Sequence, residues 1–341
     1  MVVNVVYLIT GGTGLVGSFL IDMLVENSHY ENGKCEVLTR SSEDMINIQK
    51  RGLQPIKADL TDISSLKKAL KDVDVVFNLA ALATDWAGWD ELYKVNVEGM
   101  NNLIEACLAN NTESFLNHTS STGVYGHYIP SIPIDETHKF NPTSIYQKSK
   151  YLQEKAIWDV YKDNGWENFS IIRPPSVIGP RDMKTMFGIF KAVYEQKFPI
   201  LRKGAGYLTF IHPYDLCSAL LLIDEKKELA KGRVYNLKSF ECKFIDFLNY
   251  IVNKIDPPKL PKQRDFRLVY TVAILSEIYA KITRKHTTLN RYRVTKFAFS
   301  RRYNDNKIKN ELRFQPQKSM EVTIDEAYEW LIQKKLFPPS H

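Results

Sequence analysis

A glycine-rich turn near the N-terminus constrains the fold of this chain more than any other feature. The turn, TGGTGLVG, occupies residues 10–17 and follows the apolar run Val5–Ile9, which is typical of a strand buried on both faces. Apolar residues then recur at helical spacing over Gly14–Val25. A buried strand, a tight glycine turn and a helix in this order predict the first unit of a parallel α/β sheet.

Each glycine of this turn suits the geometry of a bound dinucleotide. Gly11 permits the tight turn, Gly14 lets the backbone approach a pyrophosphate, and Gly17 lets the helix pack closely on the strand. The free N–H groups at the helix N-terminus favour the phosphate charge. We therefore predict that this turn binds a nicotinamide dinucleotide. The predicted contacts are Gly11, Thr13, Gly14, Leu15, Val16 and Gly17.

The first half of the chain repeats this alternation of strands and helices. Further strands are predicted at Cys35–Thr39, Pro55–Ala58, Val73–Leu79, Phe115–Thr119 and Phe169–Ile172, and helices at Ile63–Leu70, Glu91–Leu108 and Ser144–Tyr161. The rhythm predicts an α/β fold with a Rossmann-type, doubly wound parallel sheet. Beyond residue 173 the strands shorten and helices come to dominate. We therefore expect a dinucleotide-binding domain over residues 1–173. A smaller, mainly helical C-terminal substrate lobe is expected over 174–341, with one or two returns to the first domain.

Composition argues against several classes of protein. The net charge of +7 comes from 46 basic and 39 acidic residues that are interleaved, so no nucleic-acid interface is expected. No apolar run reaches the roughly 18 residues that a membrane-spanning helix needs, and no signal peptide is recognisable, so a cytoplasmic location is expected. Cys35, Cys107, Cys217 and Cys242 are isolated in the sequence, which predicts buried, reduced thiols and no metal site.

The end of the second predicted strand bears on the choice of cofactor. An NAD site usually has an acidic residue about 20 residues after the glycines, where it binds the ribose 2′-hydroxyl. This chain has Arg40 in that region, and the next acid is Glu43. Because a guanidinium pairs well with a phosphate, Arg40 favours NADP(H) over NAD(H). The alternative interpretation is that Arg40 is a solvated cation in a loop.

One tyrosine–lysine pair is a candidate for proton transfer. Tyr146 and Lys150 lie one turn apart on a predicted helix, where a lysine ammonium favours the ionised tyrosine. The spacing alone is weak evidence, because it recurs at Tyr30/Lys34, Tyr151/Lys155 and Tyr303/Lys307, with Tyr30 and Tyr303 in polar, turn-like segments. A functional pair needs a hydroxyl partner at the carboxyl end of a strand, and serines follow the predicted strand Phe115–Thr119.

The segment HTSSTGVYG at residues 118–126 resembles the serine motif of the extended short-chain dehydrogenase/reductases, which include the NAD-dependent epimerases and dehydratases. In that family the catalytic serine lies three places before the Val-Tyr-Gly step. This rule selects Ser121, and Tyr146 follows 25 residues later, at the family's usual spacing. The resemblance implies hydride transfer at the nicotinamide, with Tyr146 as acid and base on the substrate oxygen. Ser121 would hydrogen-bond that oxygen, and Lys150 would contact the nicotinamide ribose and lower the pKa of Tyr146.

The resemblance extends over nearly the whole chain. It implies that Asp59 holds the adenine amine, that residues 78–81 pass under the cofactor, and that Asn96 completes the catalytic set near the lysine. The segment RPPSVIGP at 173–180 matches the loop that packs on the nicotinamide. The further cofactor contacts implied are Leu60, Leu79, Ala80, Ala81, Thr119, Pro174, Ser176 and Val177. A homodimer formed through the helices at 91–108 and 144–161 is likewise implied.

Two features bear on the branch of the family and on its substrate. Members that act on nucleotide sugars usually carry an arginine for the substrate pyrophosphate at the position of Leu208. In this chain Arg181, Arg202 or Lys203 could compensate for its absence. The segments 85–89, 289–294 and 303–307 resemble the 3β-hydroxysteroid dehydrogenase/isomerase-like branch. Together these features favour a small-molecule substrate that is sizeable and apolar, either sterol-like or long-chain.

The stretch Phe266–Ile282 predicts a helix with a wide apolar surface. The favoured interpretation is a buried helix of the second lobe. The alternative is a lid, or a helix at 266–285 that makes peripheral contact with a membrane. Lys281, Arg284 and Lys285 would then suit anionic lipid.

Three functions remain open on the sequence. The leading one is an NAD(P)-dependent oxidoreductase that interconverts a secondary alcohol and a ketone. The second is a nucleotide-sugar epimerase or dehydratase whose NAD stays tightly bound. The third is a non-catalytic dinucleotide sensor, which the presence of Ser121, Tyr146 and Lys150 disfavours. His138 and His212 are interpreted as structural rather than catalytic.

Overall fold

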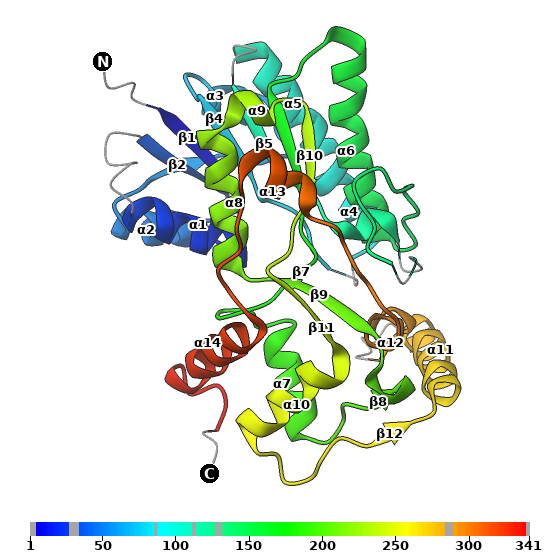
Figure 1. Cartoon of the computed structure of the whole chain (residues 1–341). Helices are drawn as coiled ribbons and strands as arrows, with labels where there is room; N and C mark the ends of the chain where they lie inside the picture. The colour runs from blue at the N-terminus through cyan, green and yellow to red at the C-terminus, as the bar shows by residue number, and fades with distance from the viewer. Residues whose placement is uncertain are drawn as a thin grey trace.

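A parallel seven-stranded sheet forms the centre of the molecule, in the order β10-β6-β5-β4-β1-β2-β3 (Figure 1). The computed structural model describes residues 5–26, 34–84, 87–110, 114–126, 130, 132–283 and 289–338. The strands of this sheet are β1 (Val6–Thr10), β2 (Lys34–Thr39), β3 (Gln54–Lys57), β4 (Val75–Asn78), β5 (Phe115–Thr119), β6 (Phe169–Arg173) and β10 (Arg233–Asn236). The strand order reverses between β1 and β4, which is where doubly wound sheets bind ligands. The structure confirms the predicted Rossmann-type fold.

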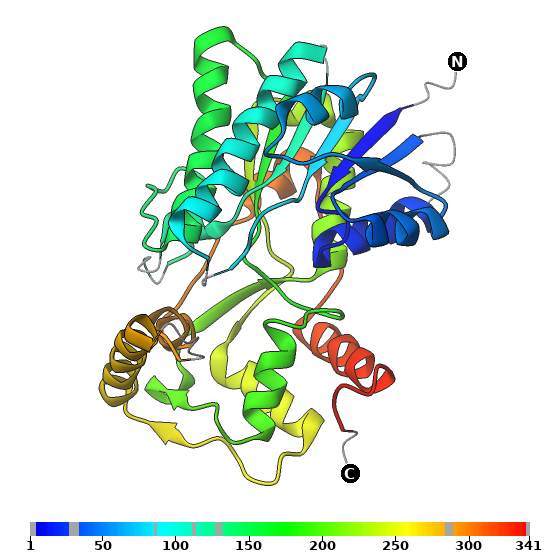
Figure 2. The same cartoon turned by 180° about the vertical axis from the view of Figure 1, so that it is seen from behind.

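Helices cover both faces of the sheet (Figures 1 and 2). One face carries α3 (Ile63–Ala69), α5 (Gly99–Asn110) and α6 (Ile145–Asn164), and the other carries α1 (Leu15–Glu26) and α8 (Pro213–Glu225). Leu66, Leu103 and Ile157 are fully buried on the first side. Leu20 and Leu220 are fully buried on the second. Two apolar cores therefore hold the sheet between them.

The helix α6, which carries Tyr146 and Lys150, begins and ends at strong local signals. Ser144 Oγ accepts a hydrogen bond from the Gln147 N–H, and Gln147 Oε1 accepts one from the Ser144 N–H, so the two residues form a capping box. Gly165 ends the helix in the left-handed conformation. These signals fix where α6 begins and therefore which way its side chains point.

One short helix is absent from the expectations drawn from the sequence. It is α2 (Ser42–Lys50), which follows β2 and starts where Ser41 Oγ accepts from the Asp44 N–H. Ile48 is the one buried residue of α2, so this helix has no extended apolar face that a periodic pattern in the sequence could have indicated. The N-cap serine and the acidic first turn were the available signals.

Residues beyond 173 form a second lobe and also return to the sheet (Figure 1). The returning elements are β10, α8, α9 (Lys227–Ala230) and α13 (Asn306–Leu312). The second lobe holds the sheet β11-β9-β7, the strand pair β12-β8 and five helices. Its elements are β7 (Ser176–Val177), α7 (Met186–Tyr194), β8 (Ile200–Leu201), β9 (Tyr207–Ile211), β11 (Phe240–Lys243), α10 (Phe244–Ile255), β12 (Gln263–Arg264), α11 (Phe266–Thr283), α12 (Arg291–Ala298) and α14 (Met320–Gln333). In the part of the chain that the structure describes, no helix is long and apolar enough to cross a membrane.

The helix α11 differs from the favoured interpretation of its sequence. One face, around Ala273, packs against Leu201, Val294 and Ala298. The opposite face is open to solvent, where Leu275 is 59% exposed. The prediction of a buried helix is therefore wrong. Apolar residues surround most of this helix, and its neighbours cover only one side of it.

The four cysteines are free, and two of them are less buried than expected. Cys107 and Cys217 lie in the core, whereas Cys35 and Cys242 are half-buried. Burial raises the pKa of Cys35 and that of Cys107 to about 12. All four thiols are therefore protonated and unreactive near neutral pH.

Candidate active site and cofactor cradle

The glycine-rich turn joins β1 to α1 and lies against the chain that leaves β4. Gly11 has a φ of +71°, and a Cβ built on it would come within 2.8 Å of the Ala80 backbone. A Cβ built on Gly17 would come within 2.2 Å of the Gly11 carbonyl oxygen. No side chain fits at either position, so these glycines are what lets α1 start at the switch point of the sheet.

The outer part of this turn is the candidate cradle for cofactor phosphates. Thr13 and Gly14 are exposed, and Leu15 and Val16 at the start of α1 are half-buried. The first N–H groups of a helix have no partners within the helix and carry a partial positive charge. The backbone at this helix N-terminus is accessible, and the glycines behind it leave no room for a side chain. This arrangement fits the pyrophosphate of a dinucleotide.

A buried polar row runs beneath the turn across three strands. Thr10, Asn78 and His118 are register partners on β1, β4 and β5. Thr10 Oγ1 donates to Asn78 Oδ1 at 2.7 Å and accepts from the Ala80 N–H at 3.2 Å. Asn78 Nδ2 lies 3.1 Å from His118 Nδ1. Burial, and after it the charge of Lys150, lowers the pKa of His118 well below 6.5, so the row holds a neutral imidazole.

This row positions the segment that follows β4, where Leu79, Ala80 and Ala81 were predicted to pass under the cofactor. The three residues are half-buried, and the Leu79 N–H donates to the Thr10 carbonyl oxygen at 3.2 Å. The segment is therefore bonded to the end of β1 directly beside the glycine turn. The row was not predicted from the sequence. Each of its residues is a polar residue at or near the end of an apolar strand, but β1, β4 and β5 are neighbours only in the sheet.

Arg40 and Asp59 follow β2 and β3 and lie together beyond the carboxyl ends of these strands. Arg40 Nη1 is 3.7 Å from Asp59 Oδ2, and the two side chains are 71% and 36% exposed. Burial tends to raise the pKa of Asp59, but hydrogen bonds from Thr61 and the charge of Arg40 outweigh it and lower that pKa. An exposed ion pair contributes at most about 1 kcal/mol, so a bound phosphate can compete for Arg40. Leu60, by contrast, has its side chain in the apolar core.

Lys150 reaches from α6 to the carboxyl end of β5. Its Nζ donates to the Thr119 carbonyl oxygen at 2.9 Å, and the side chain is buried. Burial lowers the pKa of Lys150 to about 8, against the opposing effect of the Glu154 carboxylate. Ser121 lies just beyond Thr119, and its Oγ accepts from the Gly123 N–H at 3.0 Å. That bond uses a lone pair of Ser121 and leaves its hydroxyl proton available for donation.

Tyr146 lies one turn before Lys150 on the same face of α6 and is half-buried. The next residue, Gln147, packs on the turn after Ser121. A Cβ built on Gly123 would come within 3.1 Å of Gln147 Cγ and 3.2 Å of Ser121 Oγ. The first turn of α6, which carries Tyr146, therefore packs against the serine segment, and Lys150 reaches the end of β5 from the following turn.

Of the other tyrosine–lysine pairs, Tyr30/Lys34 includes a tyrosine outside the described residues. The ring of Tyr151 lies 5.2 Å from the ring of Phe140, and the side chain packs against the apolar cluster of Val124, Tyr125, Ile134 and Tyr303. Tyr303 is buried, with its ring stacked 6.1 Å from that of Tyr125. Its predicted place in a polar turn is therefore wrong, since its ring completes an apolar cluster with Tyr125.

Asn96 lies in a π-helix. The helix predicted over residues 91–108 consists of α4 (Trp89–Leu92), the π-helix η2 (Tyr93–Glu98) and α5. Asn96 is fully buried; its Oδ1 accepts from the Leu82 N–H at 2.7 Å and its Nδ2 donates to Ser149 Oγ at 2.9 Å. Gln153 Nε2 donates to the Asn96 carbonyl oxygen at 2.9 Å. These bonds join η2, the segment after β4, and α6, which indicates a positioning residue rather than one that touches reacting atoms.

A buried ion pair braces α6 behind this site. Glu154 lies one turn after Lys150, and its Oε2 is 2.6 Å from Nη2 of Arg173 at the end of β6. Neither side chain is more than 2% exposed. Glu154 also accepts from Ser120 Oγ, and Arg173 Nη1 donates to the Tyr125 hydroxyl at 2.7 Å. The sequence analysis missed this network, because no local spacing links residues that only the sheet brings together.

The loop after β6 joins the two lobes at the site. The Pro174 carbonyl oxygen accepts from the Thr122 N–H at 2.9 Å, which bonds this loop to the serine segment. Ser176 and Val177 form β7 and are register partners of Phe210 and Ile211 on β9. The three predicted nicotinamide contacts in this loop therefore lie between the serine segment and the second lobe.

Both histidines named from the sequence occupy structural positions. His212 is 1% exposed, and its Nδ1 accepts from the Tyr214 N–H at 3.0 Å to cap α8. Burial lowers the pKa of His212 to about 4. The ring of His138 lies 5.9 Å from that of Tyr125, outside the group around Thr119.

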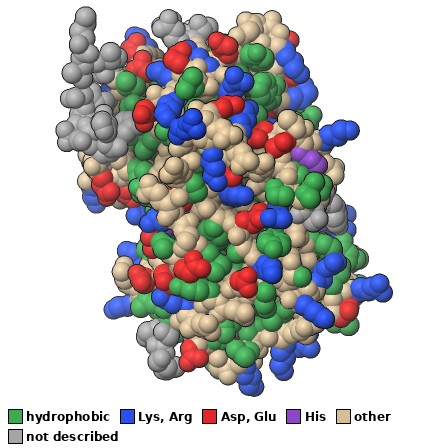
Figure 3. All heavy atoms as spheres, viewed as in Figure 1, with side chains coloured by type: hydrophobic (Ala, Val, Ile, Leu, Met, Phe, Trp, Pro, Cys, Tyr) green, Lys and Arg blue, Asp and Glu red, His purple; other side chains and the backbone are tan. Residues whose placement is uncertain are grey.

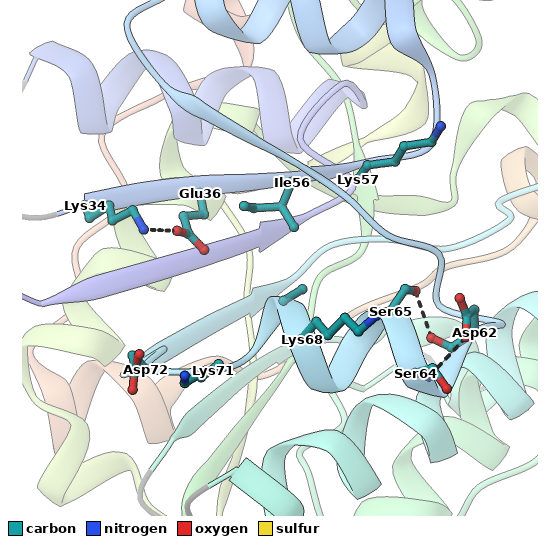
Figure 4. A pocket seen from close by; sticks show the side chains of 11 residues that line it. Lys34, Glu36, Ile56, Lys57, Asp62, Ser64, Ser65, Lys68, Lys71 and Asp72 are labelled. Atoms are coloured by element: carbon teal, nitrogen blue, oxygen red, sulfur yellow. Dashed lines mark hydrogen bonds and ion pairs between the residues drawn. The ribbon is translucent and has the colours of Figure 1, made fainter.

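Two surface depressions lie away from this arrangement. One, of about 450 Å³, is lined by residues of β2, β3 and α3, with lysines and acids of both signs around it (Figure 4). The other, of about 620 Å³, is bounded by Tyr125 and residues 137–141. Neither is lined by Ser121, Tyr146 or Lys150, so neither is the candidate active site.

The sequence segment 85–89 was one of those that favoured the 3β-hydroxysteroid dehydrogenase/isomerase-like branch of the family. Its residues 85 and 86 lie outside the described residues.

Comparison with known proteins identifies the family. A model described as NAD dependent epimerase/dehydratase family matches residues 7–237, more than half of the chain. The chain is 26% identical over 307 residues to the N-acetyl-alpha-D-glucosaminyl-diphospho-ditrans,octacis-undecaprenol 4-epimerase of Escherichia coli O157:H7, with 88% of each chain covered. It is 24% identical over 357 residues to 3beta-hydroxysteroid-dehydrogenase/decarboxylase isoform 1 of Arabidopsis thaliana, covering 93% of this chain and 78% of that protein. The crystal structure of gox2253 matches with a TM-score of 0.79 at 25% identity, over 98% of this chain and 100% of that one. This chain therefore belongs to the NAD-dependent epimerase/dehydratase family and is an enzyme of the extended short-chain dehydrogenase/reductase type.

Proposed function

We propose that this enzyme is an NADP(H)-dependent oxidoreductase that interconverts a secondary alcohol and a ketone on a sizeable, apolar substrate. The observation that carries the substrate class is the environment of Leu208. Family members that act on nucleotide sugars usually place an arginine at this position. Here the leucine is 2% exposed and packs in the apolar core of the second lobe with Phe210 and Phe247. An apolar side chain cannot pair with a substrate pyrophosphate.

Two of the three cations that could replace that arginine are engaged elsewhere. Arg181 Nη1 lies 2.6 Å from Asp22 Oδ2, and its guanidinium stacks 4.5 Å from the ring of Phe19. The guanidinium of Arg202 stacks 4.6 Å from the ring of Phe299. Lys203 is exposed. This distribution of charge supports a substrate that lacks a nucleoside diphosphate.

The names of two relatives support the apolar part of this proposal. One is the 4-epimerase of a sugar linked through a diphosphate to undecaprenol, so its substrate carries a pyrophosphate as well as a long apolar chain, and the other is a hydroxysteroid dehydrogenase/decarboxylase. A polyprenol and a steroid are both large apolar groups, so we propose a long-chain or sterol-like substrate for this enzyme as well.

We propose that Ser121, Tyr146 and Lys150 carry the chemistry. The bound cofactor supplies or accepts a hydride at its nicotinamide ring. In the direction of reduction, Tyr146 gives its hydroxyl proton to the substrate oxygen as that oxygen gains negative charge. Ser121 donates a hydrogen bond to the same oxygen, using the proton that its bond with Gly123 leaves available. The Lys150 ammonium then stabilises the ionised Tyr146.

We propose that Arg40 selects NADP(H) through the 2′-phosphate, while Asp59 accepts from the adenine amine. The support is that Arg40 is exposed, lies at the end of β2 and, among the residues that the structure describes, forms one weak ion pair, with Asp59. We also propose a homodimer formed by the outer surfaces of α5 and α6, which lie next to each other on one face of the sheet. Sedimentation at several protein concentrations tests that assembly.

The proposed function is tested by combining cofactors with substrates of different chemistry. The thermal midpoint of the full chain is measured with NADPH or NADH, each with a sterol ketone, a long-chain ketone or a nucleotide sugar. We expect NADPH to raise the midpoint more than NADH. When an apolar ketone is added to the enzyme with NADPH, the absorbance of the reduced nicotinamide should fall as NADPH is oxidised. Turnover of a nucleotide sugar with no turnover of any ketone would contradict the proposal.

A second candidate is an epimerase in which the cofactor is recycled without net redox change. This candidate is favoured because the similarity to the undecaprenol-linked sugar epimerase covers 88% of that protein. On this hypothesis the purified protein retains NAD(H) after gel filtration, and a lipid-linked or nucleotide-linked sugar is converted with no change in that absorbance. Retained NAD(H) together with sugar conversion would therefore replace the leading proposal.

A further inference from the structure

We propose that α11 docks this enzyme on the surface of an anionic lipid bilayer, with the side of the helix opposite Ala273 in contact with lipid. This face, named the α11 face below, is the most continuous apolar surface that the described residues expose. It consists of Leu268, Val272, Leu275, Ile278, Tyr279 and Ile282, which are between 46% and 76% exposed. A soluble protein rarely leaves such a patch uncovered unless it binds something.

The spacing of these residues makes one surface of them. Leu268, Val272, Leu275, Tyr279 and Ile282 follow each other at intervals of four and three, which places them on one side of a helix. Thr271 also lies on this side, and its hydroxyl donates to the Arg267 carbonyl oxygen at 2.9 Å, so its hydrogen-bonding proton is satisfied inside the helix. Thr271 therefore adds no unpaired hydroxyl proton to the α11 face.

The charges around α11 favour an anionic partner. Arg267 and Lys281 are exposed near the two ends of the helix. Three further exposed cations precede it in the sequence, namely Lys259, Lys262 and Arg264, and they outnumber the one exposed carboxylate among residues 259–265, Asp265. Within α11, which the structure describes in full, the single carboxylate is Glu277. Its oxygens bond to Arg291, so it does not oppose an anionic surface.

The same charges argue against a second copy of the chain as the occupant. An antiparallel pair of α11 helices would set Arg267 of each copy beside Lys281 of the other. A parallel pair would set like beside like at both ends. Each arrangement places cations of the same sign together, which is unfavourable. Anionic headgroups instead complement both ends of the helix, and each cation near such a surface adds about 1 kcal/mol.

The arrangement of the molecule leaves this contact free. Figures 1 and 2 place α11 at the outer edge of the second lobe, away from the seven-stranded sheet. In Figure 3, hydrophobic side chains bordered by Lys and Arg appear on the lower right, where α11 lies. A bilayer at this edge would leave the phosphate cradle and the group around Thr119 on the other lobe accessible to cofactor.

Vesicle binding tests this proposal without reference to turnover. The full chain is sedimented with vesicles of phosphatidylcholine alone or of phosphatidylcholine with phosphatidylglycerol. We expect binding to the anionic vesicles that weakens as salt is added. The double variant Leu275→Asp/Ile282→Asp should bind at least about tenfold more weakly, because it removes two apolar contacts and adds two like charges. Leu229→Asp is the matched control, because Leu229 is 60% exposed on α9 and should leave binding unchanged.

The outcomes separate the alternatives. If the wild-type chain does not bind anionic vesicles, or if Leu229→Asp weakens binding as much as the double variant, the proposal is wrong. It is also wrong if the double variant converts a dimer to a monomer in the absence of lipid, since the α11 face would then bind a second copy. The variant Arg267→Glu/Lys281→Glu keeps every apolar contact and should also bind anionic vesicles more weakly. It provides the test even if the aspartate variant unfolds.

Discussion

Lys150 is a charged side chain where little water reaches it, and its burial lowers its pKa to about 8. In the unfolded chain its pKa is near 10.5, so between these values the unfolded chain binds one proton more than the folded chain. The free energy of unfolding should therefore rise with pH in this window, because the cost of burying a charged lysine disappears. We expect the wild type to gain about 1 kcal/mol relative to Lys150→Met between pH 7 and pH 9.

Urea denaturation of the two proteins at both pH values measures this difference. The comparison cancels the titration of every group that the two proteins share. If the two stabilities change in parallel with pH, then Lys150 is not buried as a titrating ammonium. Turnover should show the opposite trend, since loss of the ammonium above about pH 8 removes the charge that favours ionised Tyr146.

Tyr146 is the residue on which the proposed proton transfer depends most directly. Tyr146→Phe removes the hydroxyl and keeps the ring, so we expect kcat to fall by about 10²- to 10⁴-fold with little change in cofactor affinity. Tyr151→Phe is the matched control on the same helix, because Tyr151 lies five residues after Tyr146 and its ring packs beside that of Phe140. Equal turnover by Tyr146→Phe and the wild type would remove Tyr146 from the mechanism.

Arg40 decides the choice of cofactor if the proposal is right. Arg40→Ala removes a charge-assisted bond to the 2′-phosphate, and we expect NADPH affinity to fall about ten- to a hundredfold while NADH affinity changes little. Lys50→Ala, at an exposed position on α2, should leave both affinities unchanged. Fluorescence titration of both cofactors gives the four dissociation constants. Equal losses for NADPH and NADH would show that Arg40 does not recognise the phosphate.

At the scale of elements, the π-helix η2 is the joint between the cofactor side and the catalytic side of the site. The side-chain amide of Asn96 hydrogen-bonds to Leu82 and to Ser149, and so connects the segment after β4 to α6. Asn96→Ala leaves the half-buried Leu82 N–H without its acceptor, and we expect a loss of about 1–3 kcal/mol in the free energy of unfolding together with a lower kcat.

Ser149→Ala is the graded control for that joint. It removes the hydroxyl that accepts from Asn96 and donates to the Tyr146 carbonyl oxygen at 2.8 Å, and leaves the Asn96–Leu82 bond in place. We expect a smaller loss, of about 1 kcal/mol. Chemical denaturation measures the free energy of unfolding of both variants and of the wild type. A free energy of unfolding for Asn96→Ala within about 0.5 kcal/mol of the wild-type value would contradict a positioning role.

Local patterns predicted those elements whose signals lie within a short stretch of sequence. The glycine turn, the strand before Ser121 and the helix predicted over Ser144–Tyr161 are of this kind, and their elements form where the sequence places them. The π-helix was read as an ordinary helix, because one inserted residue hardly disturbs apolar spacing. The exposure of α11 was misjudged because periodicity reports which residues are apolar and not how many neighbours the fold supplies.

The site shows the same division. The serine motif and Tyr146 lie within one short stretch of sequence, so the family resemblance could point to both residues. The pair Glu154–Arg173 and the row that includes His118 depend on which strands lie side by side. Strand order is a property of the whole sheet, so no single stretch of the sequence contains it.

At the scale of the whole molecule, the chain builds its first lobe from both halves of the sequence. The strand β10 extends the sheet beside β6, and α8 packs across α1. The core beneath α1 contains Leu216, Leu220 and Tyr235, all fully buried and all beyond residue 173. Residues 1–173 alone would therefore expose to water the part of this face that α8 covers.

This arrangement predicts how truncated chains behave. A fragment of residues 1–173 lacks α8 and β10, so we expect no cooperative thermal transition and strong binding of a hydrophobic dye. A fragment of residues 1–237 keeps both elements and lacks α13, whose Ile308 and Leu312 complete the same core. It should unfold cooperatively at a lower temperature than the full chain and still bind NADPH at the glycine turn. Cooperative folding of 1–173 would show that the sheet does not depend on its returning elements, and the two lobes would then be separable domains rather than one interwoven unit.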